Sequence, residues 1–391
     1  MKSRFPISLL IICCLLPLSM ALRNEPQQLP QASIRKLGTD ALALSVFQHI
    51  ARRTEGNVAY SPASLEDVLL LLKKGASGTT AAELQQLAYG QQGVRTAMSP
   101  HCATALFLDE RLKLKPGVFD GEVQHAPLST NANRAVSQIH HWCSRQTKGS
   151  ISSIVSPGDF DENSRLVAVS AVALDEAWQA AFTKDKTCPA PFTLTNGRKQ
   201  EVSMMHLNLW CPYAEGKGWK AVALPYKVTQ NGEPGYFIGI LPQGNVREFV
   251  KNLTPETLKK IRLALREDVR KYTTVRLPAF SVQPQDIDFR PILQDLGVSR
   301  MFSPEAEFDG FIANSQPLKV SKLVQKCKVR VHEQGTKAEA VTVSVMPLAC
   351  SAPAPPPRPT RSITFDHPFI WLISDLSSAA PPWFMGVYEG N

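Results

Sequence analysis

Residues that could catalyse a reaction are sparse in this 391-residue chain. It contains no GxSxG nucleophile elbow, HExxH zinc motif, GxxxxGK[ST] phosphate loop or GxGxxG dinucleotide motif. His140 and His141 are adjacent, so on a helix their side chains diverge by about 100° and cannot ligate one metal ion. Cys350 has no base that the sequence pairs with it, as a nucleophile would require. We therefore expect no enzymatic activity, no cofactor and no metal site.

A basic cluster has the spacing of a helix and could bind a partner. Its four residues follow one another at intervals of 3, 4 and 4, which places them on one helical face: Lys259, Arg262, Arg266 and Arg270. The opposite face is apolar and consists of Leu258, Ile261 and Leu265. A polyanion such as a glycosaminoglycan or a nucleic acid could bind the basic face. The alternative is a solvated helix surface with no partner.

The run from Thr336 to Val345 alternates in size. The even positions hold the small residues Thr, Ala, Ala, Thr and Ser, and the odd positions hold Lys, Glu, Val, Val and Val. Because successive side chains of a strand point to opposite faces, this run could enter a sheet with its small residues inward. An ordinary strand that is always in place would show the same alternation. The run leads into SAPAPPPRPT at 351–360, whose prolines exclude a packed strand, and this favours an exposed loop that can become a strand.

The composition limits the class of protein. Of the residues, 43% are hydrophobic and 20% are charged, and the formal net charge is +9, which excludes a protein with many membrane spans. The eight cysteines are too few for a small disulfide scaffold, and none form a CxxC pair of the kind found in zinc ribbons.

The N-terminus has the three parts of a secretory signal peptide. Lys2 and Arg4 precede an apolar run at 7–18, and small residues close the segment at Ala21. We expect a signal peptide at 1–21 and a loose tail at 22–40. The mature protein would be secreted, to the extracellular space or to the periplasm of a bacterium, with no membrane span left. An uncleaved signal anchor is the alternative.

The rest of the chain indicates one α+β domain at 41–391, because no linker or repeat interrupts it. Apolar periodicity predicts helices at 41–50, 66–74, 80–89 and 134–147. Strands are predicted at 236–241 and 273–280, and a central strand at 165–174 because RLVAVSAVAL is rich in Val and Ala and too apolar for an edge strand. Asn196-Gly197 predicts a hairpin.

Several segments in order resemble the serpins, a family of serine protease inhibitors that act as suicide substrates. EQGTKAEAVT at 333–342 resembles the family's hinge, and NVAYSPASL at 57–65 resembles its shutter, with Ser61 and Ser64 on the paired serines. Trp178 matches the family's breach tryptophan, and the two C-terminal signatures are matched at 365–369 and 384–386. The hinge residues implied by this match are Glu333, Gly335, Thr336, Ala338, Ala340 and Thr342.

Three residues depart from the family pattern around the central sheet. Ser170 and Glu176 stand where the family has Asn and Gly before the breach tryptophan, and Gln325 stands where it has the shutter histidine. These changes could alter how readily the sheet opens.

The resemblance implies a serpin fold of three β-sheets and eight or nine helices, with a reactive loop at about 336–362 above a five-stranded sheet. It implies a monomer that a serine protease attacks in this loop. The loop then inserts into the sheet while the protease is still bound as an acyl-enzyme. A non-inhibitory serpin that serves as a binder, carrier or chaperone is the alternative.

The resemblance also places the bond that the protease cleaves. Family members are cleaved sixteen residues after the hinge glutamate, which gives Ala349-Cys350, with Leu348-Ala349 as a neighbouring alternative. Small or apolar residues there suit an elastase-, chymotrypsin- or subtilisin-like enzyme. Arg358 would suit a trypsin-like enzyme, but it lengthens the inserting segment and precedes Pro359. A cysteine protease target stays open.

Overall fold

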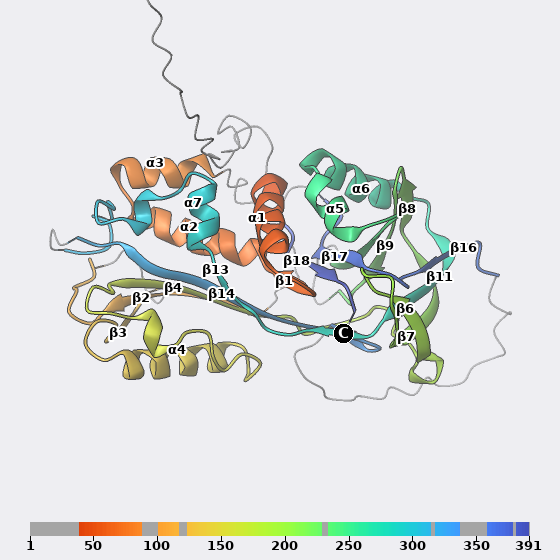
Figure 1. Ribbon diagram of the computed structural model, residues 1–391, viewed down its shortest axis with the longest axis horizontal. Coiled ribbons are helices and arrows are strands. Elements are labelled where there is room, and N and C mark those ends of the chain that lie inside the picture. Colours follow the sequence, from red (N-terminus) through yellow and green to blue (C-terminus); the bar gives the residue numbers. More distant parts are fainter. Residues whose placement is uncertain are drawn as a thin grey trace, which may run out of the picture.

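The computed structural model describes residues 39–87, 101–116, 123–228, 234–313, 317–336, 358–377 and 381–390. These residues form a long sheet with helices on both faces, joined at one end to two further sheets (Figure 1). The α-helices are α1 (Thr39–Arg53), α2 (Pro62–Gly75), α3 (Gly78–Gln86), α4 (Ala132–Gln146), α5 (Val246–Asn252), α6 (Pro255–Glu267) and α7 (Arg290–Asp295). Three short 3-10 turns are η2 (Pro157–Asp159), η3 (Lys184–Lys186) and η4 (Arg300–Phe302).

The large sheet is built around two parallel central strands. Its order is β3 (Val123–Ala126), β2 (His101–Asp109), β4 (Leu166–Ala173), β14 (Val320–His332), β15 (Gly335–Thr336) and β5 (Glu176–Ala177). The outer edge of β14 pairs with β12 (Phe280–Val282) and β13 (Asp286–Asp288). The sheet thus has eight strand segments rather than five. The edge beside β14 is divided into β12 and β13, and the two-residue strands β15 and β5 lie at one end of the sheet. The predicted central strand is confirmed as β4, which is buried along its whole length.

Two smaller sheets pack at the other end of the molecule. The six-stranded sheet has the order β1 (Val58–Tyr60), β18 (Phe384–Tyr388), β17 (Phe369–Ser374), β10 (Tyr236–Pro242), β9 (Trp219–Pro225) and β8 (Tyr213–Gly216). The four-stranded sheet has the order β16 (Arg361–Thr364), β11 (Lys271–Pro278), β7 (Lys199–Cys211) and β6 (Cys188–Thr193). The hairpin predicted at Asn196-Gly197 joins β6 to β7, and Gly197 has the positive φ of 81° that such a turn requires.

The helices begin where side chains can cap them. Ser61 caps α2 by accepting a hydrogen bond from the Ser64 amide, and Pro62 takes the first helical position. Asn131 caps α4 and Thr254 caps α6 in the same way. Helix α2 therefore starts four residues before the apolar run that predicted it.

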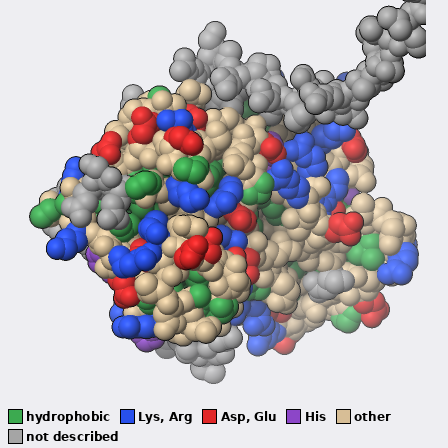
Figure 2. All heavy atoms as spheres, turned by 60° about the vertical axis from the view of Figure 1, so that its left-hand side comes forward, with side chains coloured by type: hydrophobic (Ala, Val, Ile, Leu, Met, Phe, Trp, Pro, Cys, Tyr) green, Lys and Arg blue, Asp and Glu red, His purple; other side chains and the backbone are tan. Residues whose placement is uncertain are grey.

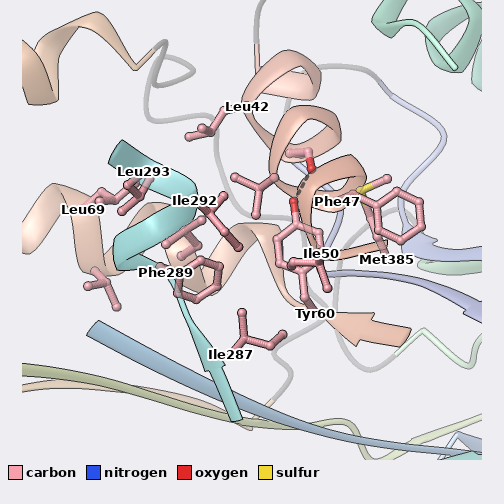
Figure 3. Packing of buried hydrophobic residues seen from close by; sticks show 14 of the residues in the cluster. Leu42, Phe47, Ile50, Tyr60, Leu69, Ile287, Phe289, Ile292, Leu293 and Met385 are labelled. Carbon is pink, nitrogen blue, oxygen red and sulfur yellow. Dashed lines mark hydrogen bonds between the residues drawn. The ribbon is translucent and has the colours of Figure 1, made fainter. Parts of the chain in front are cut away.

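A hydrophobic cluster fills the space between the helices and the large sheet (Figure 3). Phe47 of α1, Tyr60 of β1 and Ile292 of α7 lie within it, and all three are buried. The Tyr60 hydroxyl donates a hydrogen bond to the Ala43 carbonyl, so its polar end is satisfied inside the core. On the other face of the sheet, α4 covers a second cluster that includes Trp142.

The described residues contain seven α-helices and three 3-10 turns, and the expected count of eight or nine helices applies to the whole chain. In the described part of the chain, no helix is long and apolar enough to cross a bilayer.

Candidate functional site

The hinge enters the large sheet as a short strand. Gly335 and Thr336 form β15, which pairs antiparallel with β14 on one side and with β5 on the other. The partners of Thr336 are Val331 on β14 and Glu176 on β5. The first member of the size-alternating run, together with the glycine before it, therefore lies between two strands.

Thr336 is held by an aromatic cluster. Its side chain is 0% exposed, and its Oγ1 lies 2.7 Å from the Tyr226 hydroxyl. The Tyr226 ring stacks on Trp178 at 4.7 Å between centroids and 8° between planes. Burial raises the pKa of Tyr226, so this hydroxyl keeps its proton at neutral pH. A small hydroxyl residue fits this place, whereas a long charged side chain would be buried without a partner.

Trp178 also fixes the turn that leads into the hinge. Its Nε1 donates to the His332 carbonyl at 2.8 Å, and its amide donates to the Gln334 carbonyl at 3.0 Å. The Phe182 amide donates to the Glu333 carbonyl at 2.8 Å. At Gly335 a Cβ atom would overlap the Glu176 carbonyl oxygen, so only glycine lets the two strands approach here. Glu333, Gly335, Thr336 and Trp178 thus lie together in the structure.

Glu176 is the charged neighbour of the hinge. It is half-buried on β5, directly opposite Thr336. Burial raises the pKa of its carboxyl above the usual range, and the negative charge of Asp175 adds to the effect.

A closed polar network lies below, at the middle of the sheet. The Gln325 amide accepts from the Ser61 backbone at 2.7 Å and donates to the Ser61 carbonyl at 3.0 Å. It also donates to the Ser170 hydroxyl at 3.2 Å, which lies 2.6 Å from the Ser64 hydroxyl. All four residues are buried. Gln325 thereby joins β14 to β4 and to the start of α2.

Below the hinge, β4 and β14 are direct neighbours. They pair in parallel from Val167 with Lys322 to Ala173 with Lys328, and Ser170 is the partner of Gln325. A strand that entered from Thr336 would have to separate these two strands and open the network at Gln325.

The chain returns to the body at the edge of the four-stranded sheet. The Thr360 amide donates to the Tyr272 carbonyl at 3.0 Å, and β16 then pairs in parallel with β11. Arg361 donates to both oxygens of Asp268, at 2.9 and 3.0 Å, and its guanidinium lies 5.2 Å from the centroid of the Tyr213 ring.

Comparison with known proteins identifies the family. The family model described as "Serpin (serine protease inhibitor)" matches residues 38–389. The chain belongs to the serpin family. It is 29% identical over 370 residues to Serpin-ZXA of Oryza sativa subsp. japonica, covering 86% of this chain and 90% of that protein. It is 28% identical over 363 residues to Leukocyte elastase inhibitor A of Rattus norvegicus, covering 85% of this chain and 93% of that protein.

Solved serpin structures show the same fold. The structure of Serpin48, described as a highly specific serpin of the insect Tenebrio molitor, superposes with a TM-score of 0.75 at 21% identity. The match covers 90% of this chain and 97% of that one. The three sheets of this serpin are therefore the three sheets that the sequence resemblance implied.

The predicted basic face of this serpin is wrong in two residues. Arg262 is 1% exposed and points into the protein, where it contacts Asp40 at 2.8 Å and Asp375 at 3.2 Å. Burial raises the pKa of Asp40, and this outweighs the opposing charge of Arg262. Arg270 lies beyond the end of α6 at Glu267 and is therefore not on the helix.

The two remaining basic residues, Lys259 and Arg266, are exposed on α6. On the face that Figure 2 shows, basic side chains lie in separate groups with acidic ones between them. The net positive charge is thus not gathered into one band on that face.

Other predicted positions fall outside the described residues or lie apart from the hinge. Ala338, Ala340, Thr342, Leu348, Ala349 and Cys350 lie outside them. Arg358 is described and exposed. No group of three or more His, Cys, Asp or Glu side chains within the described ranges could hold a metal ion.

Nothing in the sequence indicated the two residues that hold the hinge and the returning chain, Tyr226 and Asp268. Tyr226 belongs to a Leu-Pro-Tyr motif that by itself predicts no contact with the hinge, yet it is the partner of Thr336. Asp268 gave no signal at all, because its partner Arg361 lies 93 residues further along the chain.

Proposed function

We propose that this serpin inhibits serine endopeptidases of the elastase, chymotrypsin or subtilisin type as a suicide substrate. The observation that carries the proposal is the hinge, because Thr336 already lies between β14 and β5, at the start of a run of alternating small residues. An inhibitor of this kind needs a loop segment that can continue into the sheet.

The register of β15 supports this continuation. Because Thr336 opposes Val331 on an antiparallel strand, Ala338 would oppose Val329, and Ala340 would oppose Cys327. These residues of β14 are buried, and residues opposite each other on paired strands point to the same face. Small side chains would therefore enter the packed face. Thr342 would lie between Gln325 and Ser170, at the polar network.

The chemical step belongs to the protease. Its serine would attack the carbonyl carbon of the residue before the cleaved bond, which we call the bait residue. The peptide bond breaks, the new amino terminus is released, and the bait residue stays joined to the serine as an ester. Insertion must then distort the protease before water cleaves that ester. Each new backbone hydrogen bond contributes only about 1 kcal/mol net, so burial of apolar surface must supply much of the driving force.

The bait bond that fits the hinge best is Ala349-Cys350, with Leu348-Ala349 as the neighbouring alternative. Arg361 is held in β16 by Asp268 and is therefore excluded as a bait in this conformation. Arg358 is exposed, but Pro359 follows it directly. A cysteine protease would also accept a small apolar bait, and it belongs among the enzymes tested.

A non-inhibitory serpin, acting as a binder or carrier, is the second candidate. The observation that favours it is the closed network around Gln325, which fastens β14 to β4 where insertion must separate them. We further propose a secreted monomer whose signal peptide is removed. Of the four residues of the predicted basic face, Lys259 and Arg266 are the two that are exposed on α6 and could contribute to polyanion binding.

The test mixes the mature protein with elastase, chymotrypsin, trypsin, subtilisin and papain in turn, followed by denaturing gels and intact mass. A complex that survives denaturant establishes the inhibitor, and the mass of the released peptide locates the bait bond. Cleavage in the loop without any complex supports the non-inhibitory serpin. Melting of the cleaved form then shows whether the loop inserts, because insertion raises the melting temperature.

A further inference from the structure

A cavity of about 610 Å³ opens at the base of the hinge, and the proposed inhibition makes no use of it. Its walls include the short strand β12, the end of β14, the start of the turn before β15, and Thr187, which follows η3. Because β12 pairs with the outer edge of β14, the cavity lies away from the line between β4 and β14 that an inserting strand would occupy. Its volume is within the range of small-molecule sites, which is about 300–1,000 Å³.

The register of β12 gives the cavity an apolar wall and a polar wall. Phe280 pairs with Val331, and both side chains are buried. Ser281 pairs with Arg330 one residue along, so these two side chains share the other face of the strand pair. All four residues line the cavity. A ligand can therefore place an apolar body against the first pair while a polar group reaches the second.

Three polar groups that line the cavity have no partner among the described residues. The Thr187 hydroxyl is buried without a hydrogen bond, which costs free energy. The Arg330 guanidinium and the Glu333 carboxylate form neither an ion pair nor a hydrogen bond in the described part of the chain, although both line this cavity. The cavity thus presents one positive and one negative group that are not paired with each other.

Two other cavities differ in this respect. In the cavity of about 370 Å³ at the end of α6, both carboxylates are engaged, Asp268 by Arg361 and Asp375 by Arg262. In the cavity of about 300 Å³ beside η2, Lys322 is paired with two aspartates. The protein itself neutralises these charges, whereas the two at the base of the hinge are available to a ligand.

The spacing of the two charged residues sets the length of a ligand that reaches both. Arg330 and Glu333 are three residues apart at the end of a strand, so their Cα atoms are separated by at most about 10 Å. An ω-amino acid with a chain of eight carbon atoms, when extended, holds its charged ends roughly 10 Å apart. A molecule of this length matches the separation without any movement of the strand.

We propose that this cavity binds a small zwitterion with an apolar body, such as an ω-amino acid. Its carboxylate would pair with Arg330 and accept a hydrogen bond from Ser281, and its ammonium group would pair with Glu333. The methylene chain would lie against Phe280, and the Thr187 hydroxyl would gain the hydrogen bond that it lacks. A ligand with a single charge would leave either Arg330 or Glu333 unmatched. Binding needs neither a protease nor loop insertion, so it stands apart from the proposed function.

The test titrates the full-length mature protein with ω-aminooctanoate in a calorimeter. Octanoate and octylamine are the comparison, because each has the same carbon chain and only one of the two charges. We expect ω-aminooctanoate to bind one site per chain and the two comparison molecules to bind about tenfold more weakly, since each lacks one charge-assisted contact.

Variants then assign the contacts. Arg330→Gln and Glu333→Gln should each weaken the binding of ω-aminooctanoate by about tenfold, and Thr187→Val should weaken it less, because a neutral hydrogen bond contributes less than a charged one. Arg266→Gln is the matched control, since Arg266 is an exposed arginine that lines the cavity at the end of α6. This control should bind the probe as wild type does.

Hydrogen exchange of the wild type locates the bound probe. The amides of β12 and of the turn at 333–334 should exchange more slowly with ω-aminooctanoate bound, whereas those of α6 should not change. Protection at α6 instead would place the probe in the other cavity and overturn the inference. The same holds for an absence of saturable binding below about 10 mM, for unchanged binding in both Arg330→Gln and Glu333→Gln, and for octanoate that binds as tightly as ω-aminooctanoate. The octanoate comparison uses wild type alone, so it decides the question even where a variant fails to fold.

Discussion

The two ends of the reactive loop are attached to the body in different ways. At the N-terminal end, Thr336 is fully buried between two strands and is held by neutral hydroxyl and backbone contacts. At the C-terminal end, Thr360 is exposed, and Arg361 lies at a sheet edge with an ion pair to Asp268.

The difference suits the proposed mechanism, in which only the N-terminal end of the loop would move. The strand at Thr336 points toward the line along which β4 and β14 pair directly, with no strand between them. The strand at Arg361 is fastened by charge and runs parallel to β11, away from that line. Under the proposed mechanism, the first end would extend as a strand after cleavage while the second would stay on its sheet.

The largest effect should follow from Thr336→Arg. A guanidinium in this dry site would have no counter-charge, so the hinge could not enter the sheet. We expect the variant to be cleaved and to trap no protease, as judged on denaturing gels. Thr360→Arg is the matched control at the exposed end, and it should leave the ratio of trapping to cleavage unchanged. Full trapping by Thr336→Arg would refute the role of the hinge.

Arg361→Ala should destabilise the C-terminal end. The change removes charge-assisted hydrogen bonds to Asp268 in a half-buried site, which are worth about 2 kcal/mol. Urea unfolding of the uncleaved protein measures the loss. Arg358→Ala, at an exposed position without a described ion pair, should shift the unfolding free energy by less than about 0.5 kcal/mol. If Arg361→Ala and Arg358→Ala have the same unfolding free energy, the ion pair between Arg361 and Asp268 does not stabilise this end of the loop.

Tyr226→Phe should loosen the N-terminal end by a smaller amount. It removes the hydroxyl that lies 2.7 Å from Thr336 Oγ1 and leaves the ring stack on Trp178 intact. A neutral hydrogen bond contributes about 1 kcal/mol, so the Gly335 and Thr336 amides should exchange hydrogen about five times faster. Tyr213→Phe, which removes an exposed hydrogen bond to Glu215, is the control. Unchanged exchange in Tyr226→Phe would show that strand pairing alone holds the hinge.

The smallest effect should come from Glu176→Gln and should depend on pH. Burial and Asp175 raise the pKa of Glu176, so folding favours its protonated form. The stability that this group contributes is fully present below its unfolded pKa and is lost as the pH rises through the folded value. The variant should therefore melt higher than wild type at pH 7, and the difference should vanish toward pH 4. A difference that stays constant over this range would disprove the assignment.

The sequence predicted the elements best where the apolar pattern was strong. The run rich in Val and Ala at 165–174 forms β4, and the helix predicted at 134–147 is α4 at Ala132–Gln146. The number of helices expected for the whole chain can be compared only with the described residues, which contain seven α-helices. The hinge residues were assigned by resemblance to the family, and of the size-alternating run only Thr336 lies among the described residues.

The prediction of a basic face was wrong for Arg262 because of its position around the helix. Arg262 lies about 40° from Leu258 around α6, on the border of the apolar stripe, whereas Lys259 lies about 100° away. Spacing alone cannot tell on which side of the border a residue falls. Arg262 points inward because the carboxylates of Asp40 and Asp375, which lie far from it in the sequence, both form ion pairs with its guanidinium. Helix α6 ends before Arg270 because Asp268 turns away to bind Arg361 and the Tyr213 amide.

The network at Gln325 has a consequence for the surroundings in which the protein can work. Its members are an amide, serine and threonine hydroxyls, backbone groups and the Cys327 thiol, which donates to Gln325 Oε1 at 3.3 Å, and none of these groups takes up a proton as the pH falls from 8 to 5. A histidine at the same place would become charged over this range. Acidification should therefore not weaken the hydrogen bonds that join β4 to β14, and the two strands should stay paired equally well at neutral and at mildly acidic pH.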